Sequence, residues 1–308
     1  MHIKKFIKSG LNRFPYISSL YAESKLYRKN AIYPPGHFYS PIVSVDEILS
    51  DSERIWNQNN EEIAGIDLRV KEQLNLVGNF QKYYKDIPFT EERSLLYRYY
   101  FINEFYSFTD GIILYSFIRH YKPRKIIEVG SGFSSALMLD VNKLFFGDSI
   151  GLSFVEPFPL RLKSLLSDND NEKYTLFEKK IQDVSLDIFT ELDENDILFI
   201  DSSHISKTGS DVNHIIFRVL PLLKEGVIIH FHDIFFPFEY PKEWVIGGRN
   251  WNELYLLRAF LMNNPGYEIL LFSHYLHTNF PEVFRNMPLA YKDGGSNFWF
   301  KKSLSQTQ

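Results

Sequence analysis

Short apolar runs alternate with amphipathic stretches in the second half of the chain. The runs cover residues 125–130, 150–156, 174–181, 196–201 and 226–233. Short apolar segments separated by helical patterns are typical of βαβ units with parallel strands. Two later runs, at residues 267–273 and 297–302, predict an antiparallel pair at the sheet edge. The pattern therefore predicts an α/β fold with a mostly parallel sheet, an antiparallel last strand and helices on both faces.

The N-terminal third lacks this regularity. Residues 33–79 mix several prolines with polar segments and show neither a helical nor a strand period. From Thr90 to Ile102 the spacing of apolar residues predicts a helix, and a second helix is predicted to end before Pro123. We therefore divide the chain into an N-terminal helical cap or lid at residues 1–89 and an α/β domain at residues 90–308.

Composition narrows the classes of partner. The formal net charge is −4, so the chain lacks the broad basic field with which proteins bind nucleic acid, and no nucleic-acid partner is expected. Cysteine is absent, which leaves His, Asp and Glu to hold any metal. The lack of cysteine fits a reducing compartment, and no run approaches the roughly 18 apolar residues of a membrane span. A cytoplasmic protein without a transmembrane segment is expected.

The first thirty residues are basic. Lysines and arginines outnumber the single acid, Glu23, and apolar residues are interleaved among them. We favour a solvated amphipathic helix packed on its own domain. The alternative is a helix in weak contact with an anionic membrane surface or with a partner.

A glycine-rich turn follows the first predicted strand. The text IIEVGSGFSSA covers residues 126–136, and a helix is predicted to begin at about Ser134. A strand, a glycine turn and a helix direct backbone N–H groups at a ligand. Ser135 stands where a dinucleotide fingerprint needs its third glycine, and Glu128 lies two residues before the turn. That carboxylate disfavours a pyrophosphate and favours a ligand with a positive amino group and a sulfonium.

Polar residues follow the next two strands. Glu156 ends the second strand, where such folds hold ribose hydroxyls, and Gln182 and Asp183 follow the third at the height of an adenine edge. Together with the E-x-G-x-G text of the glycine turn, this pattern resembles the class I S-adenosylmethionine-dependent methyltransferases over most of residues 125–300. The resemblance implies a Rossmann-like methyltransferase sheet with S-adenosylmethionine as cofactor. The predicted cofactor contacts are Glu128, Gly130, Ser131, Gly132, Phe133, Ser134, Glu156, Gln182, Asp183 and Asp201.

Titratable residues gather after the fourth and fifth strands. Asp201 and His204 follow the fourth strand, and His232 and Asp233 end the fifth. The carboxyl ends of parallel strands open into one crevice, so these four side chains are expected to converge. An imidazole with a near-neutral pKa suits removal of a proton from a methyl acceptor. His204 is therefore the candidate base.

The text around these strand ends adds a second resemblance. FIDSSH, SKTGSDVN and HDIFFPFEYPKEW resemble a bacterial methyltransferase family related to sugar and antibiotic O-methyltransferases. In metal-dependent relatives, an Asp after strand four and an acidic pair after strand five bind Mg²⁺. The resemblance implies catalytic roles for His204, Asp201 and Asp233, and a divalent metal at Asp201, His232 and Asp233. Because His232 replaces the usual acid or amide, Zn²⁺, Mn²⁺ or Fe²⁺ is preferred there.

The sequence therefore predicts an S-adenosylmethionine-dependent methyltransferase that methylates an oxygen of a small molecule or of a sugar or polysaccharide precursor. Two alternatives stay open: a metal-dependent hydroxylase on the same fold, and a non-catalytic module that binds S-adenosylmethionine. The aromatic segment at residues 235–251 is expected to form either a lid over the acceptor or a packed surface loop.

Overall fold

The computed structural model describes residues 15–57, 62–167, 170 and 172–303. These residues form two compact units. The first unit combines the described residues up to Asn57 with Glu243–Asn250. The second contains the described residues of the ranges 62–242 and 251–303. The candidate site lies within the second unit.

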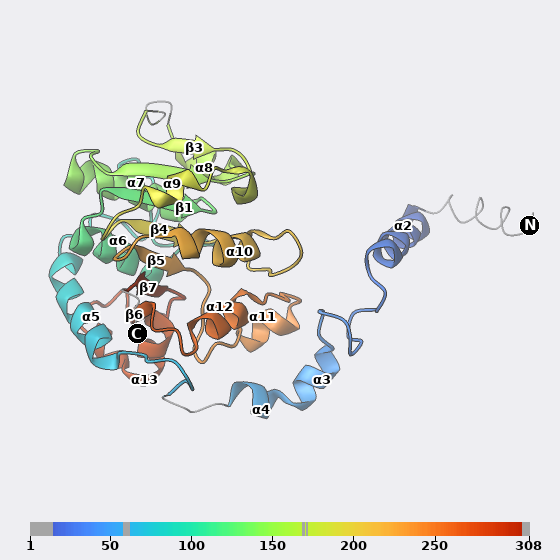
Figure 1. The fold of residues 1–308 in the computed structure, drawn as a ribbon. Coiled ribbons are helices and arrows are strands. Elements are labelled where there is room, and N and C mark those ends of the chain that lie inside the picture. Colours follow the sequence, from blue (N-terminus) through green and yellow to red (C-terminus); the bar gives the residue numbers. More distant parts are fainter. Residues whose placement is uncertain (1–14, 58–61, 168–169, 171, 304–308) are drawn as a thin grey trace, which may run out of the picture. The chain divides into compact units, whose positions relative to one another are not determined.

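The second unit is built on a sheet whose described strands run in the order β3-β2-β1-β4-β5-β7-β6 (Figure 1). The strands are β1 (Lys125–Val129), β2 (Gly151–Val155), β3 (Thr175–Phe177), β4 (Ile197–Ile200), β5 (Ile228–Phe231), β6 (Tyr267–Phe272) and β7 (Phe298–Lys302). β1 to β5 pair in parallel, whereas β7 is antiparallel to both β5 and β6. The predicted fold class is confirmed, including its antiparallel last strand.

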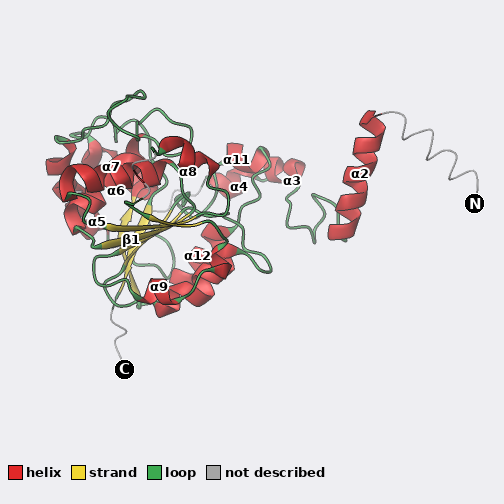
Figure 2. Ribbon diagram, turned by 90° about the horizontal axis from the view of Figure 1, so that it is seen from above, coloured by secondary structure: helices red, strands yellow, loops and turns green. Residues whose placement is uncertain are grey.

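Helices cover both faces of this sheet. α6 and α7 lie on one face, and α9 and α12 lie on the other (Figure 2). The α-helices of this unit are α5 (Val70–Tyr84), α6 (Phe108–Tyr121), α7 (Phe133–Phe146), α8 (Leu160–Leu165), α9 (Asp187–Thr190), α10 (Asp211–His214), α12 (Glu253–Leu261) and α13 (Ser273–Asn279). Shorter turns are η2 (Ile181–Asp183), η3 (Ile215–Val219), η4 (Leu220–Leu222) and η5 (Pro281–Phe284).

The central strands form the core of the unit. Every residue of β4 and β5 is buried, as expected for parallel strands with helices on both faces. Trp299 on β7 stacks on Phe117 of α6, with the ring centroids 3.9 Å apart. Each large apolar side chain buried in this way contributes about 1.5–3 kcal/mol. The packed core fixes the carboxyl ends of β1, β4 and β5 next to one another.

The helix predicted at residues 90–102 is wrong. This described segment has no helix and forms an irregular loop. Tyr99 and Phe101 are buried, whereas Leu95 is fully exposed. The Tyr99 N–H donates to the Asp140 carboxylate on α7 at 3.0 Å. These contacts with a distant part of the chain override the local helical spacing.

α5 adds residues to the sheet unit that the sequence assigns to the cap. It buries Gln73, Leu76, Val77 and Phe80, and it packs against α6 and β6. The sheet unit therefore includes residues 62–89, and its boundary lies earlier than the predicted boundary at 89/90. The separate roles given to residues 1–89 and 90–308 stay a prediction.

The first unit holds α2 (Pro15–Asn30), α3 (Val45–Ser50), α4 (Ser52–Trp56) and most of α11 (Lys242–Ile246). α2 has no buried residue among those described, and the expected packing of this basic helix on its own domain stays a prediction. Residues 1–14 lie outside the described residues, and the membrane-surface contact stays a prediction. Within the described ranges, no helix combines the length and the apolar character needed to cross a membrane.

The aromatic segment at residues 235–251 is divided between the two units. Phe235, Phe236, Phe238 and Tyr240 are buried in the sheet unit. Glu243–Asn250 belongs to the first unit. The first half of the segment is therefore packed, as the surface-loop alternative expects.

Candidate active site

The glycine turn brings the ends of β1 and β4 together. Gly130 has a φ of +84°, and a Cβ built there would lie 1.7 Å from the backbone oxygen of Asp201. Any other side chain would require both a left-handed backbone and a displaced β4 exit. The Gly132 N–H donates to the Ser135 hydroxyl at 2.9 Å, and α7 begins at Phe133. The turn is therefore shaped by close backbone approach.

Glu128 lies beneath this turn and is fully buried. Its carboxylate accepts hydrogen bonds from the hydroxyls of Ser134, at 2.5 Å, and Ser135. Burial raises the pKa of Glu128 to about 8, although the serine hydrogen bonds oppose the shift. Glu128 lines neither cavity described below. In this structure it acts on the turn through the two serines, and its direct contact with a cofactor stays a prediction.

Glu156 occupies the exit of β2 beside the glycine turn. Its Oε2 accepts from the Ser131 N–H at 3.1 Å, and its Oε1 accepts from the Phe158 N–H at 2.7 Å. The carboxylate is fixed by these two bonds, and each oxygen retains a lone pair for a ribose hydroxyl. Arg161 on α8 lies nearby, with its guanidinium 3.5 Å from the ring centre of Phe105. The sequence indicated Glu156 but gave no signal for Arg161.

A cavity of about 500 Å³ opens beyond the ends of β1, β2 and β4. Its walls include Glu156, Phe158, Ile181 and Gln182. The Gln182 Nε2 donates to the Gly209 carbonyl at 2.8 Å, while its buried Oε1 has no partner among the described residues. Asp183 is exposed and is not part of this lining. The structure therefore brings Gln182, but not Asp183, to the cavity wall.

A second cavity of about 310 Å³ continues from the first. The two share Gly130, Glu156, Asp201, Ser202 and Ser203. The second is also lined by Ser131, Gly132, Phe133, Ser134, Phe105, Tyr106, Arg161, His204, His232, Asp233 and Trp251. It therefore joins the glycine turn to the titratable residues after β4 and β5, as the sequence predicts.

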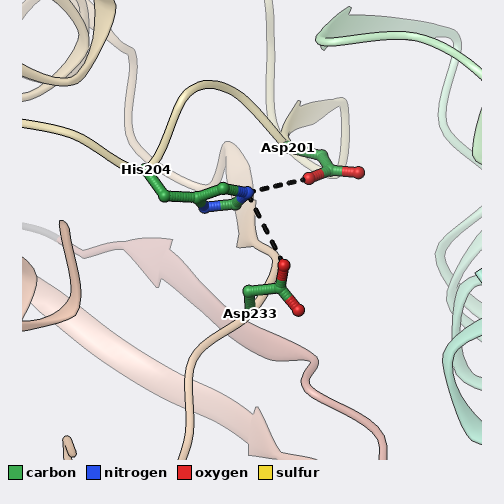
Figure 3. A group of neighbouring side chains, drawn as sticks. All are labelled: Asp201, His204 and Asp233. Atoms are coloured by element: carbon green, nitrogen blue, oxygen red, sulfur yellow. Dashed lines mark ion pairs between the residues drawn. The ribbon is translucent and has the colours of Figure 1, made fainter. Parts of the chain in front are cut away.

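Asp201, His204 and Asp233 converge in this second cavity (Figure 3). The His204 Nε2 lies 3.3 Å from Asp201 Oδ1 and 3.6 Å from Asp233 Oδ2. His204 and Asp233 each have a φ of 58°, a left-handed conformation that His and Asp adopt more readily than most residues. On the other side of the ring, His204 Nδ1 lies 2.8 Å from Glu253 Oε2.

The charges of this group are strongly coupled. Burial lowers the pKa of His204, but hydrogen bonds to Asp201 and Glu253 outweigh it and hold that pKa well above its ordinary value. For Asp201, burial raises the pKa, and the charges of His232 and His204 overcome this effect and lower it. One imidazole therefore faces three carboxylates.

His232 lies beside the other carboxylate oxygen of Asp233. Its Nε2 is 3.7 Å from Asp233 Oδ1 and 4.0 Å from Asp110 Oδ2. The Ser296 hydroxyl donates to Asp233 Oδ1 at 3.0 Å and thereby fixes that carboxylate. Burial raises the pKa of Asp110 to about 7. Within the described ranges, the group whose ligand atoms all lie within 4.8 Å of one another consists of Asp201, His204 and Asp233, so His204 takes the place predicted for His232.

Three residues near the cavities were missed by sequence reasoning, namely Asp110, Arg161 and Glu253. Trp251, which lines the second cavity, ends the aromatic segment that was expected as a lid or a surface loop. Glu253 carries the one usable signal, because it is an acid that opens an otherwise apolar helix, ELYLLRAFL. The others stand on elements far from β4 in the sequence, and only the fold brings them close.

Comparison with known proteins places this geometry in context. A family model described as a methyltransferase domain matches residues 127–234. An uncharacterised protein of Archaeoglobus fulgidus is 39% identical over 171 residues, which cover 53% of this chain and 75% of that protein. A Podospora anserina methyltransferase structure with bound S-adenosylhomocysteine is 16% identical, with a TM-score of 0.42, over 90% of this chain and 100% of that one. A Bacillus cereus O-methyltransferase in complex with S-adenosylhomocysteine is 12% identical, with a TM-score of 0.37, over 85% and 100%.

The sheet order, the glycine turn and the matched domain define a class I S-adenosylmethionine-dependent methyltransferase. The matched segment runs from β1 to just beyond the end of β5, and so it contains the five residues that line both cavities. The chain belongs to the same family as its Archaeoglobus fulgidus relative, and residues 127–234 match the methyltransferase-domain model. The enzyme class and the cofactor predicted from the sequence are confirmed.

Proposed function

We propose that the two cavities together hold S-adenosylmethionine and a methyl acceptor. The residues present fit the cofactor. The larger cavity offers Phe158 and Ile181 as apolar walls for adenine and the free Oε1 of Gln182 for its amino group. Glu156 would hold the ribose, and Gly130 allows the exits of β1 and β4 to approach closely beside it.

Electrostatics support a cationic cofactor in the second cavity. Asp201 and Asp233 line this cavity on the side where the methyl group must be presented. Carboxylates at short range favour a positive sulfonium and amino group. Arg161 lines the same cavity near the glycine turn, where it would pair with the methionine carboxylate. When bound, the cofactor supplies the electrophilic methyl group.

His204 is the proposed general base. A hydroxyl acceptor gives up its proton as its oxygen takes the methyl group, and an imidazole nitrogen at the cavity wall can receive that proton. The Nε2 of His204 faces the cavity between Asp201 and Asp233, which would stabilise the imidazolium that forms. To act as base, His204 must first be neutral. A sulfonium bound beside Asp201 would repel a protonated His204 ring and so favour loss of the proton from Nε2.

The walls of the second cavity support a small polar acceptor that carries hydroxyl groups. Phe105, Tyr106 and Trp251 provide aromatic faces, and Asp201 and Asp233 provide hydrogen-bond acceptors. Aromatic faces and carboxylates together suit a sugar or a polysaccharide precursor, with other small molecules as the alternative. At about 310 Å³ the cavity is of the size that takes a small ligand.

A divalent cation also fits the donor set. Asp201 and Asp233 supply oxygens and His204 supplies a nitrogen, all within 4.8 Å. A metal held there would polarise the acceptor oxygen, and because it would occupy the His204 nitrogen it is an alternative to His204 as base. Metal analysis of the purified protein tests this assignment, and stoichiometric iron without methyl transfer would instead favour the hydroxylase.

Replacement of His204 by alanine tests the proposal. We expect the initial rate of methyl transfer to fall by about 10²- to 10⁴-fold, the range associated with a lost general base. Binding of S-adenosylmethionine should stay within a few-fold, because the adenine and ribose contacts are unchanged. The measurements are isothermal calorimetry and transfer of label from S-adenosylmethionine to the small-molecule fraction of a cell extract.

His120→Ala provides the matched control. His120 is half-buried in the last turn of α6, and its replacement should leave methyl transfer unchanged. Undiminished transfer by His204→Ala would rule out its role as base. Tight cofactor binding with no methylated product from the wild-type protein would favour the non-catalytic module.

A further inference from the structure

Glu253 is a buried acid at the first position of α12, behind His204. Its exposed fraction is 1%, and its Oε2 lies 2.8 Å from His204 Nδ1. We infer that Glu253 is a positioning residue that keeps a proton on His204 Nδ1 and thereby directs Nε2 at the acceptor. The inference rests on the proposed role of His204 as base.

The contact between α12 and His204 is made at two points. The His204 carbonyl accepts hydrogen bonds from the backbone N–H groups of Asn252 and Glu253, both at 3.1 Å. The Glu253 side chain then reaches the ring of the same residue. Backbone and side chain of His204 are therefore both tied to the start of α12, so that the ring has little freedom to rotate.

The ring plane is restrained as well. The indole of Trp251 lies against the His204 imidazole, with the ring centroids 4.3 Å apart and the planes 30° apart. Burial raises the pKa of Glu253, whereas its hydrogen bond to His204 and the His204 charge lower it. With Glu253 ionised, the carboxylate only accepts hydrogen bonds, so the hydrogen shared with Nδ1 belongs to the imidazole. Which ring nitrogen carries the proton of a neutral histidine is set by the bond that the other makes. Once the ring has lost its other proton, Nε2 is therefore the acceptor toward the cavity.

A purely structural role does not explain an acid at this position. The other buried residues of α12 are Leu254, Leu257 and Leu261, which pack without any cost in lost hydration. The Glu253 Oε1 is buried and has no hydrogen-bond partner in the described part of the chain. A half-satisfied buried carboxylate destabilises the fold, so its presence points to a use in the site that it contacts.

The tautomer of His204 gives a test that needs no acceptor. In protein with ¹⁵N-labelled histidine, spectra of His204→Ala identify the His204 signals. In the neutral wild-type ring, we expect the proton on Nδ1 and none on Nε2. Glu253→Met has similar volume but no acceptor, and it should shift the neutral ring toward the Nε2–H form. Glu253→Gln, whose amide oxygen still accepts, should keep the wild-type tautomer.

Kinetics should follow the tautomer. Glu253→Met is expected to lower the rate of label transfer at saturating S-adenosylmethionine by about 100-fold, while the apparent KM for S-adenosylmethionine stays within about 3-fold. Glu253→Gln should recover most of the rate. Glu239→Ala removes another largely buried acid, one that bonds to Tyr255 on the same helix, and it should change neither readout.

Two outcomes separate this inference from the proposed function. An inactive His204→Ala together with a Glu253→Met protein of wild-type tautomer and rate would overturn the role of Glu253 alone. An active His204→Ala protein would overturn the proposed function, and the inference with it.

Discussion

Two buried charged groups in the sheet unit are built in opposite ways. Around Arg98, one cation lies between the carboxylates of Asp140 and Asp170, which are almost fully buried. Around His204, one imidazole faces Asp201, Asp233 and Glu253. Arg98 and Asp170 line a separate cavity of about 330 Å³, but the charged atoms of this group bond to one another, whereas His204 Nε2 lines the cavity that continues from the glycine turn. We interpret the first group as one that stabilises the fold, and the second carries the proposed chemistry.

The Arg98 guanidinium and the carboxylates of Asp140 and Asp170 hydrogen-bond to one another. Arg98 Nη1 donates to Asp140 at 2.5 Å, and its Nη2 and Nε donate to Asp170. The backbone N–H groups of Arg98 and Tyr99 complete the Asp140 carboxylate at 2.7 Å and 3.0 Å. Burial alone would raise the pKa of Asp170, but Arg98 and Ser167 overcome that effect and lower it. This group ties the loop at residues 90–102 to α7.

Loss of the Arg98 side chain should cause the largest change in stability. Arg98→Ala leaves the buried Asp140 without its cation and Asp170 with Lys173 alone, whose Nζ lies 3.3 Å from Asp170 Oδ1, and we expect the free energy of unfolding to fall by about 3–5 kcal/mol. Urea unfolding measures this, and label transfer per folded molecule should stay near the wild-type value. Arg124→Ala removes an exposed pair with Asp193 and should cost at most about 1 kcal/mol. Equal losses in the two variants would remove the distinction between the groups.

Neutralising Asp233 should lower the rate of label transfer and leave stability nearly unchanged, the reverse of the result expected for Arg98→Ala. Asn adopts the left-handed backbone as readily as Asp, so Asp233→Asn changes charge with little strain. We expect the rate of label transfer to fall about 100-fold, because a carboxylate that stabilises the imidazolium is lost. Stability should change by less than about 1 kcal/mol. The substitution removes the repulsion between Asp233 and Asp110 together with the attraction between Asp233 and His232, and the two effects oppose each other. Asp187→Asn, at an exposed acid on α9, is the control. A large loss of stability would contradict a functional rather than structural role.

A third effect is expected from Glu128, through the pH dependence of stability. The folded-state pKa of about 8 lies above that of the unfolded chain, so the folded state binds more protons between about pH 4.5 and 8. Wild-type stability should therefore fall as pH rises through that window, by at most about 1.4 kcal/mol per pH unit from this group. Glu128→Gln should flatten the curve measured by urea unfolding at pH 5, 6, 7 and 8. Exposed Glu191→Gln should leave the slope unchanged, and an unaltered slope in Glu128→Gln would show that Glu128 is ionised in the fold.

The parts of the fold that follow local periodicity could be predicted from the sequence. All strands and α6, α7 and α8 lie where apolar spacing places them, because strand and helix periods are local properties. The loop at residues 90–102 and helix α5 could not be predicted, since Asp140 and β6 decide their structure from far along the chain. Likewise, Asp201, His204 and Asp233 could be located from adjacent strand ends, whereas Glu253 lies 49 residues beyond His204.

Five residues line both cavities, so the proposed cofactor space and the proposed acceptor space join in one continuous trough. A compound that joins an adenosine unit to a hydroxylated mimic of the acceptor through a short linker would occupy both spaces at once. The second half would then bind at a high effective concentration, so affinity would exceed that of either half. The same trough makes substrate-sized fragments linked to adenosine the natural chemical probes for finding what this enzyme methylates.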